Sequence, residues 1–259
     1  MQGEEPLDIL PLWALLAVVL LIVLLSVECG YRLGKRVGRP DQEQDSPLDE
    51  MVGATLALLA FLLAFTFGLA ASRYDTRRQL LLDEANAIGT TWLRAAMLPE
   101  GRNEIRSLLR QYVDVRLEVV RTHDLAHNIR RSEELQAQLW ARTVPIAQKT
   151  PDAIVTGLFV QSLNELIDLH AKRLTASVRN RIPLAIWASL YGVTTLSFAV
   201  LGYHAGLASM RRSPAILPVA VTFAVVIWLI ADLDRPQEGA LTVNQQALID
   251  VRASMNAQQ

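Results

Sequence analysis

Four stretches of this 259-residue chain contain no Asp, Glu, Lys or Arg; they occupy residues 9–27, 51–72, 182–210 and 213–231. About 20 apolar residues of α-helix, each rising 1.5 Å, cross a hydrocarbon core of about 30 Å. The sequence therefore predicts four membrane spans in two pairs. Residues 1–8 are acidic and contain no Lys or Arg, so we expect the first stretch to be a retained span rather than a cleaved signal peptide.

The helix of the second span is expected to continue beyond the membrane. Apolar residues recur after Ser72 at alternating spacings of four and three, which is one face of a helix, and no proline follows before Pro99. They are Leu81, Ala85, Ile88, Trp92 and Ala95. A helix that runs from Pro47 to about Leu98 would be about 75 Å long.

The fold class predicted is all-α: four transmembrane helices, with a helical bundle inserted between spans 2 and 3 and continuous with those spans. No strand pattern or internal repeat is evident. Further bundle helices are expected at 103–122, 132–149 and 152–181, with 123–131 as a polar connection. The expected divisions are a first transmembrane hairpin at 1–72 (spans ~9–27 and ~48–72), the bundle at 73–181, a second hairpin at 182–233 (spans ~182–210 and ~214–233) and a C-terminal tail at 234–259.

Three hydroxyl–proline pairs indicate helix starts, because a hydroxyl side chain caps the first turn and proline is favoured at the first helical position. The pairs are Ser46-Pro47, Thr150-Pro151 and Ser213-Pro214. They predict helices that begin near Pro47, Pro151 and Pro214.

Several classes of function are excluded by composition and motif. The net charge is -1, so no overall basicity indicates a nucleic-acid partner, and one cysteine, Cys29, allows no internal disulfide. His123 and His127 have a spacing that can bind zinc, but no third ligand is evident nearby, so no metal site is predicted. No phosphate-binding loop, G-x-S-x-G or H-E-x-x-H motif occurs. The chain is therefore not expected to be an enzyme or to carry a cofactor.

The loop charges give two opposed indications of topology. Arg32, Lys35, Arg36 and Arg39 in the first expected hairpin loop, with Arg211 and Arg212 in the second, place both loops in the cytoplasm, with Cys29 near an interface and the termini and bundle outside. The basic residues at the membrane edge of the bundle favour the opposite orientation; they are Arg73, Arg77, Arg78, Lys172, Arg173, Arg179 and Arg181. We lean towards the extracytoplasmic bundle.

Small residues form a stripe on the second span and another on the third. Gly53 and Gly68 belong to the first stripe, and Gly192, Gly202 and Gly206 belong to the second. Small side chains let helix backbones approach closely in lipid. These glycines are therefore candidate helix-packing residues, either within one subunit or around the axis of an oligomer.

The second span also contains candidate pore residues. Phe61 and Phe65 share a helix face and would form a constriction that gates by dewetting, unless they pack against lipid or other helices. Thr66 is a candidate lining residue. Arg73 and Arg77, just beyond the span, would form cationic rings at a pore mouth in an oligomer, unless they extend to lipid headgroups.

Two polar lines occur on bundle helices. Asp83, Asn86 and Thr90 lie on the extension of span 2, and Asn164, Asp168, His170 and Arg173 lie on the last bundle helix. Such lines on facing helices pair as buried networks that determine register, and the alternative is a ligand or ion site.

Several segments are similar to the bestrophin-like domain family of bacterial membrane proteins. They are residues 62–67 (LLAFTF), 72–75 (SRYD), 84–90 (EANAIGT) and 232–236 (DLDRP), together with Asn164, Asp168, His170, Arg173, Arg181 and Pro183. The resemblance covers roughly residues 10–250. It implies a multi-pass protein of the bacterial inner membrane.

The name of this family points to bestrophins, which are pentameric anion channels with a pore lined by one span from each subunit. By that analogy span 2 lines the pore and its Phe residues form the neck. The dense acidic run with which bestrophins bind calcium is missing here, so calcium gating is not implied. Bestrophins keep their bundle in the cytoplasm, which opposes the topology read from the loops.

Two functions remain open. The first is a homo-oligomeric channel-like protein that passes small ions, with anions as the favoured candidates. The second is a membrane-anchored helical scaffold or sensor whose bundle binds a partner or ligand. The partners expected are other copies of the chain and membrane lipid, with a small ion or an unidentified protein as candidates.

Overall fold

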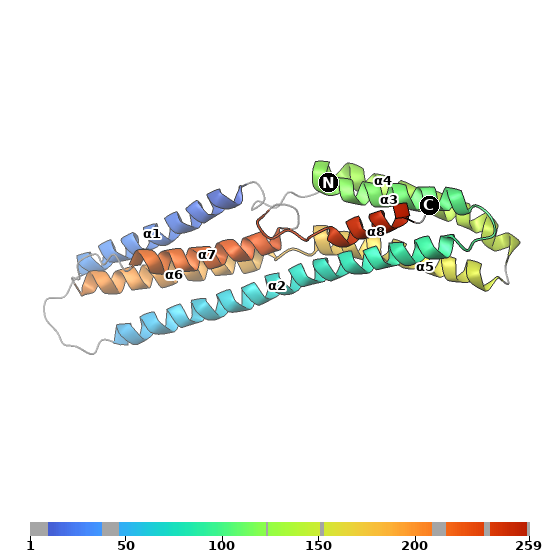
Figure 1. Ribbon diagram of the computed structural model, residues 1–259. Coiled ribbons are helices and arrows are strands. Elements are labelled where there is room, and N and C mark those ends of the chain that lie inside the picture. Colours follow the sequence, from blue (N-terminus) through green and yellow to red (C-terminus); the bar gives the residue numbers. More distant parts are fainter. Residues whose placement is uncertain are drawn as a thin grey trace. The chain divides into compact units, whose positions relative to one another are not determined.

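The computed structural model describes residues 10–37, 47–122, 124–150, 153–208, 216–235 and 239–257 (Figure 1). Over these ranges the chain is all-α, with no β-strand. The helices are α1 (Leu12–Val37), α2 (Pro47–Ala95), α3 (Arg102–Thr122), α4 (Leu125–Lys149), α5 (Ile154–Leu174), the π-helical turn η1 (Thr175–Arg179), α6 (Leu184–Leu207), α7 (Ile216–Asp234) and α8 (Gln246–Ala257).

The chain divides into two compact units. Unit 1 comprises Met1–Arg73 and Arg181–Leu241, and unit 2 comprises Tyr74–Asn180 and Thr242–Gln259. The boundary therefore falls within α2, which is one helix of 49 residues. The continuous helix predicted through span 2 is confirmed, and it ends at Ala95 rather than at Leu98.

Unit 1 contains the candidate membrane spans. Among the described residues, the helices α1, α2, α6 and α7 are long and apolar enough to cross a membrane, and each contains most of one uncharged stretch. The chain is a membrane protein.

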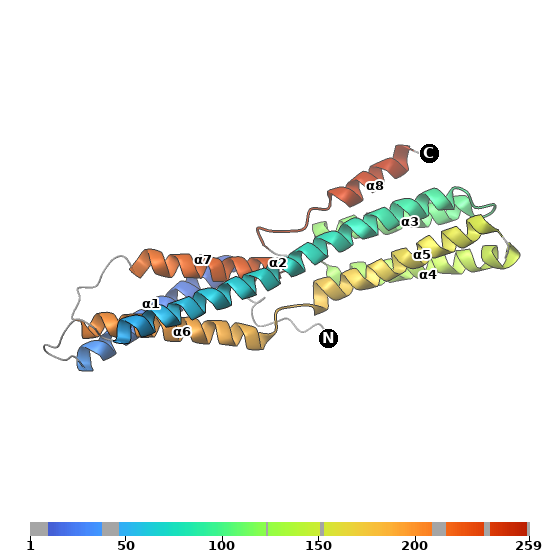
Figure 2. The same cartoon turned by 90° about the horizontal axis from the view of Figure 1, so that it is seen from below.

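Helix α1 packs along α6 and also contacts α7 (Figures 1 and 2). Glycines make the contact between α1 and α6 very close. A Cβ added at Gly202 would lie 2.1 Å from the Val27 carbonyl oxygen, and one at Gly30 would lie 2.0 Å from the Ala199 oxygen. Gly206 and Gly34 are equally restricted by backbone atoms. Only glycine fits at such positions. Each helix therefore supplies two glycines that contact the backbone of the other helix.

The first basic hairpin residues were expected in a loop, and this is wrong for three of them. Arg32, Lys35 and Arg36 lie in the last turns of α1, which continues well past the uncharged stretch. An ion pair between Arg32 and Glu28 (Nε–Oε1 2.7 Å) and the favourable position of cations at a helix C-terminus stabilise these turns. Arg39, Arg211, Arg212 and the Ser213-Pro214 cap lie outside the described residues, as does Ser46.

Unit 2 is a bundle with its own apolar core. Helix α3 packs against α4 and α8, and α4 packs against α5. The largest core side chains are Trp92, Tyr112 and Phe159, each at most 1% exposed. The C-terminal helix belongs to this bundle, because Leu248 and Met255 are fully buried in the same core.

Two local predictions about the bundle helices are wrong. The expected connection at 123–131 is mostly helix: α4 begins at Leu125 because Asp124 caps it, accepting a hydrogen bond from the His127 backbone N–H (3.0 Å). Thr150 ends α4 instead of starting α5; its hydroxyl donates to the Ile146 carbonyl oxygen (2.8 Å). Pro151, Asp152 and His123 lie outside the described residues.

The last bundle helix is interrupted before the third span. Helix α5 passes into η1, and residues 180–183 between η1 and α6 are not helical. Pro183 immediately precedes α6, where its missing N–H removes no helical hydrogen bond.

Candidate functional site

A fully buried carboxylate, that of Glu84, lies at the centre of a polar cluster in unit 2. The Arg116 Nε atom is 3.0 Å from Glu84 Oε1, and an Arg116 terminal nitrogen donates to Oε2 at 3.2 Å. Arg173 from α5 also donates to Oε2. The Tyr112 hydroxyl donates to Oε1 at 2.8 Å. Glu84 thus accepts hydrogen bonds from α3 and α5.

The helical repeat places each of these residues on the buried face of its own helix. Glu84 is three residues after Leu81 and four before Ile88, so it shares the buried face of α2 with them. Arg116 follows fully buried Tyr112 by one turn on α3. This signal was available in the sequence, because a charged residue on an apolar helix face must find partners inside the protein.

The two arginines keep Glu84 ionised although it is buried. Burial alone would raise the pKa of this carboxyl group, but the charges of Arg116 and Arg173 and the hydrogen bonds from Arg173 and Tyr112 outweigh it and lower the pKa to about 2. Glu84 lies twelve residues beyond Ser72, where the uncharged stretch ends, and so outside the expected membrane span. Burial, together with the Glu84 charge, raises the pKa of Tyr112, so its hydroxyl stays protonated.

His170 completes the cluster from α5 and is 3% exposed. Its Nδ1 atom is 3.2 Å from the Tyr112 hydroxyl oxygen, which also accepts from Gln136 of α4 (3.4 Å). The single Tyr112 hydroxyl proton goes to Glu84, so the bond to His170 must be donated by Nδ1–H. Nε2 of His170 is then an acceptor; it is buried and has no hydrogen-bond partner in the described part of the chain.

Of the predicted polar residues, only His170 and Arg173 belong to this cluster. Asn86, Thr90, Asn164 and Asp168 are exposed in the single chain, and Asp83 is half-buried and accepts a hydrogen bond from Gln79 (2.9 Å). The structure therefore brings together Glu84, Tyr112 and Arg116, which the sequence analysis did not select, with two residues that it did.

A second carboxylate, that of Asp234, links separate segments of unit 1. It accepts from the Ile182 backbone N–H (3.0 Å) and from Arg181 Nε (3.1 Å). A terminal guanidinium nitrogen of Arg73 lies 3.8 Å from the Asp234 Oδ1 atom. Arg73, a candidate for a pore mouth, is thus largely covered in the single chain, and Arg77 is 4% exposed.

Asp232, two residues earlier, holds the turn after α7. Its carboxylate accepts from the backbone N–H groups of Ala240 (2.8 Å) and Leu241 (3.1 Å). Gly239 has a φ of 152°, and a Cβ there would lie 2.1 Å from Asp232 Oδ1. The two buried aspartates at the end of α7 therefore bind different segments: Asp232 binds the turn that follows α7, and Asp234 binds Arg181 and Ile182 before α6.

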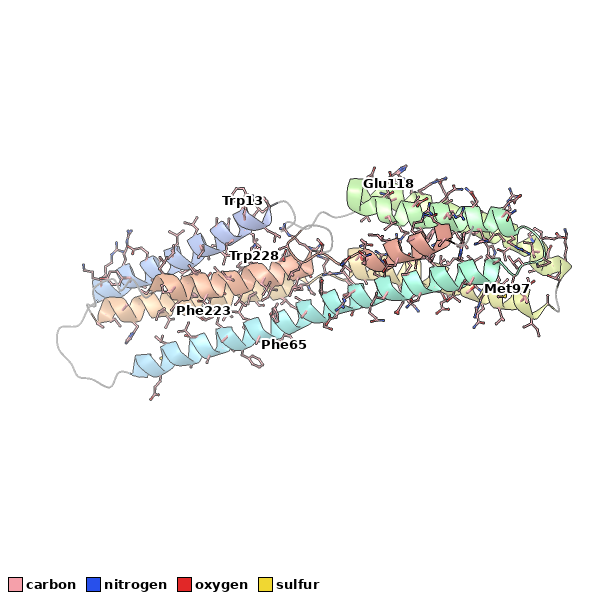
Figure 3. All side chains as sticks on the ribbon, viewed as in Figure 1. Trp13, Phe65, Met97, Glu118, Phe223 and Trp228 are labelled. Carbon is pink, nitrogen blue, oxygen red and sulfur yellow. The ribbon has the colours of Figure 1, made fainter. Side chains whose placement is uncertain are left out.

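One face of α2 in unit 1 is exposed and apolar. Phe61 is 67% exposed and Phe65 is 63% exposed, and the ring of Phe65 projects away from the helix in Figure 3. Gly53 and Gly68 lie on the same exposed side of α2 and have open space around them. On α6, Gly192 is likewise exposed and has open space around it. Thr66 points the other way: it is 2% exposed and donates to the Leu62 carbonyl oxygen (2.7 Å).

The described residues contain no group of three or more His, Cys, Asp or Glu side chains arranged to hold a metal ion. The carboxylates of the two clusters are occupied by arginines and backbone N–H groups. Chemically, the clusters are suited to holding helices in register, while the exposed α2 face is suited to contact with lipid, other subunits or a pore.

Fold and site define an all-α membrane protein with four candidate spans among its described residues. The chain matches the bestrophin-like domain over residues 13–248, so it belongs to the bestrophin-like domain family. The resemblance seen in the sequence is thereby confirmed. No curated protein sequence matches the chain.

Solved structures share the fold. Two crystal structures of a bacterial bestrophin homologue from Klebsiella pneumoniae, which carry different single substitutions, are similar to this chain with TM-scores of 0.66 and 0.67. Their sequence identities are 16% and 14%; the matches cover 94% and 95% of this chain and 97% and 98% of theirs. A crystal structure described as a membrane protein gives a TM-score of 0.68 at 13% identity, covering 93% of this chain and 96% of that one.

Proposed function

We propose that the chain is the subunit of a homo-oligomeric inner-membrane channel that passes small ions, preferentially anions, and that α2 lines the path. The observation that carries this proposal is the exposed apolar face of α2. Membership of the bestrophin-like domain family supports it, because the name of that family points to bestrophins.

Exposure of this face has a physical consequence. Large aromatic rings and adjacent small residues leave ridges and hollows that a second copy of the chain can fill, which favours close helix packing between subunits. Around an axis, Phe61 and Phe65 from each copy would form rings of apolar side chains. A narrow apolar ring expels water and so blocks ions until it widens.

The anion preference rests on the arginines that follow the span. Arg73 and Arg77 are one helical turn apart on α2, and each subunit would contribute both to the field at the end of the path. Asp234 lies 3.8 Å from Arg73 and offsets part of its charge. Arg73 and Arg77 both remain candidates for the anion preference.

The arrangement along the chain belongs to the same proposal. The helical region 73–181 would form an extramembrane bundle between spans 2 and 3, and α2 would connect it to the pore. The extracytoplasmic orientation of this bundle is part of the proposal and rests on the loop charges. An impermeant label at Gln42 tests the orientation, because labelling from outside the cell would contradict it.

Flux through liposomes that contain the purified protein tests the function. Phe65→Ala should increase basal chloride flux because it widens the constriction, whereas Phe67→Ala, two residues along and on another side of the helix, should change it little. Arg77→Gln should lower the ratio of chloride to potassium flux. A folded, oligomeric parent protein without flux would contradict the channel and favour the scaffold or sensor function.

A further inference from the structure

We propose that His170 is the proton acceptor of an acid-sensitive switch in unit 2: protonation of Nε2 places a third cation beside Glu84 and loosens the bundle around Tyr112. This inference is independent of the proposed channel function. It rests on the buried cluster, which that function does not use.

The hydrogen bonds leave one place for an added proton. Nδ1 of His170 already carries a proton, because it donates to the Tyr112 oxygen while Tyr112 donates to Glu84. A further proton can therefore bind only at Nε2. That atom is buried and has no acceptor within reach in the described part of the chain, so protonation would create a charged donor without a partner.

The charge around His170 opposes protonation. The charged and titratable groups around it are Glu84 of α2, Tyr112 and Arg116 of α3 and Arg173 of α5. Gln136 of α4 donates to the Tyr112 hydroxyl. With Glu84 ionised, these groups carry one negative and two positive charges, so the cluster has an excess of one positive charge before His170 gains any. Glu84 Oε1 is 4.0 Å from Nδ1, but both arginines already share that carboxylate.

Burial and these cations act in the same direction on His170. Burial, followed by the Arg116 charge, lowers the pKa of His170 to about 4, and the Glu84 charge only partly offsets this. In the unfolded chain the pKa is near 6.5. The unfolded state therefore binds more protons between these values, and stability falls as the pH drops from about 6.5 towards 4.

The size of the effect follows from linkage. Between pH 7.5 and pH 5, a native pKa of about 4 and an unfolded pKa of about 6.5 shift the unfolding equilibrium about 30-fold towards the open state. A shift of this size changes the amide exchange of the core residues measurably, even where the protein remains folded.

Unfolding of the full-length protein in detergent at pH 7.5 and pH 5 tests the switch. His170→Gln cannot be protonated at this position, and it should lose most of the roughly 30-fold pH effect. His127→Gln is the matched control, because His127 is exposed on α4 and should retain the effect. Equal pH dependence in the parent and in His170→Gln would overturn the proposal.

A second measurement does not depend on the folding of a His170 variant. Nitrogen NMR of the imidazole, in a protein whose other histidines (His123, His127 and His204) are replaced by Gln, should show a neutral ring with the proton on Nδ1 at pH 7. Amide exchange in α3 and α5 should accelerate as this signal titrates. A proton on Nε2 at pH 7, or titration without a change in exchange, would refute the switch.

Discussion

The Arg116 guanidinium contacts the Glu84 carboxylate through two nitrogens, with Nε 3.0 Å from Oε1 and a terminal nitrogen 3.2 Å from Oε2. Both side chains are buried, at 6% and 0% exposure. A two-point contact of this kind determines the relative rotation of α2 and α3 as well as their distance.

Replacement of Glu84 should therefore strongly destabilise unit 2. Glu84→Gln leaves Arg116 and Arg173 as buried cations without a counter-charge, and we expect a loss of about 3–5 kcal/mol. Chemical unfolding in detergent measures it. Glu134→Gln is the control, because its partner Arg131 is a surface neighbour one turn away, and this variant should unfold like the parent.

The contact between α1 and α6 predicts a difference between two glycines of the same helix. Gly202→Ala should cost about 1–3 kcal/mol, because its Cβ would collide with the backbone of Val27. Gly192→Ala should be neutral or slightly stabilising, since nothing lies within 4 Å of an added Cβ there. Thermal unfolding of the two variants in the same detergent gives the comparison, and equal losses would contradict the close contact.

Assembly can be tested at the open glycine. Gly192→Leu should leave the fold of a single subunit unchanged, because there is open space around this position within the chain. If the exposed small-residue face of α6 is a subunit interface, the same change should shift the particle to a smaller mass, measured by light scattering. An unchanged oligomer would exclude this face as the interface.

The turn after α7 should depend on its glycine. Gly239→Ala places a methyl group against Asp232 and demands a left-handed backbone conformation, so we expect it to cost about 1–3 kcal/mol. Asp232→Asn, which retains an oxygen acceptor for one of the two N–H groups, should cost less than Asp232→Ala. Protease sensitivity of the segment after Asp234 reports the loss of the turn, and resistance in all three variants would argue against this role of Asp232.

The spans, the long α2 helix and the family were predictable because each depends on local pattern. Uncharged stretches and a four-three apolar spacing require no knowledge of distant contacts. The start of α4 was not correctly predicted because the cap at Asp124 was not recognised, and the start of α5 was not correctly predicted because Thr150 can serve either end of a helix. Which end it serves depends on whether the turns before it or those after it are stabilised by packing.

The buried cluster was only half predictable. His170 and Arg173 were chosen from a polar line, but the corresponding line on α2 was assigned to Asp83, Asn86 and Thr90, which differ from Glu84 by rotation about the helix. One residue turns a helix by about 100°, and that separates an exposed from a buried position. The positions of Glu84 and Arg116 on apolar helix faces were visible in the sequence, but their pairing joins separate helices, which no spacing within one helix reveals.

The α1–α6 contact limits how this protein can change over generations. At Gly30, Gly34, Gly202 and Gly206, the atoms that a new side chain would meet belong to the opposing main chain. Trimming a neighbouring side chain therefore cannot make room. A second-site suppressor screen that starts from Gly202→Ala should therefore return no compensating substitution at Val27. The revertants recovered from a substitution at any of these four positions should carry glycine again.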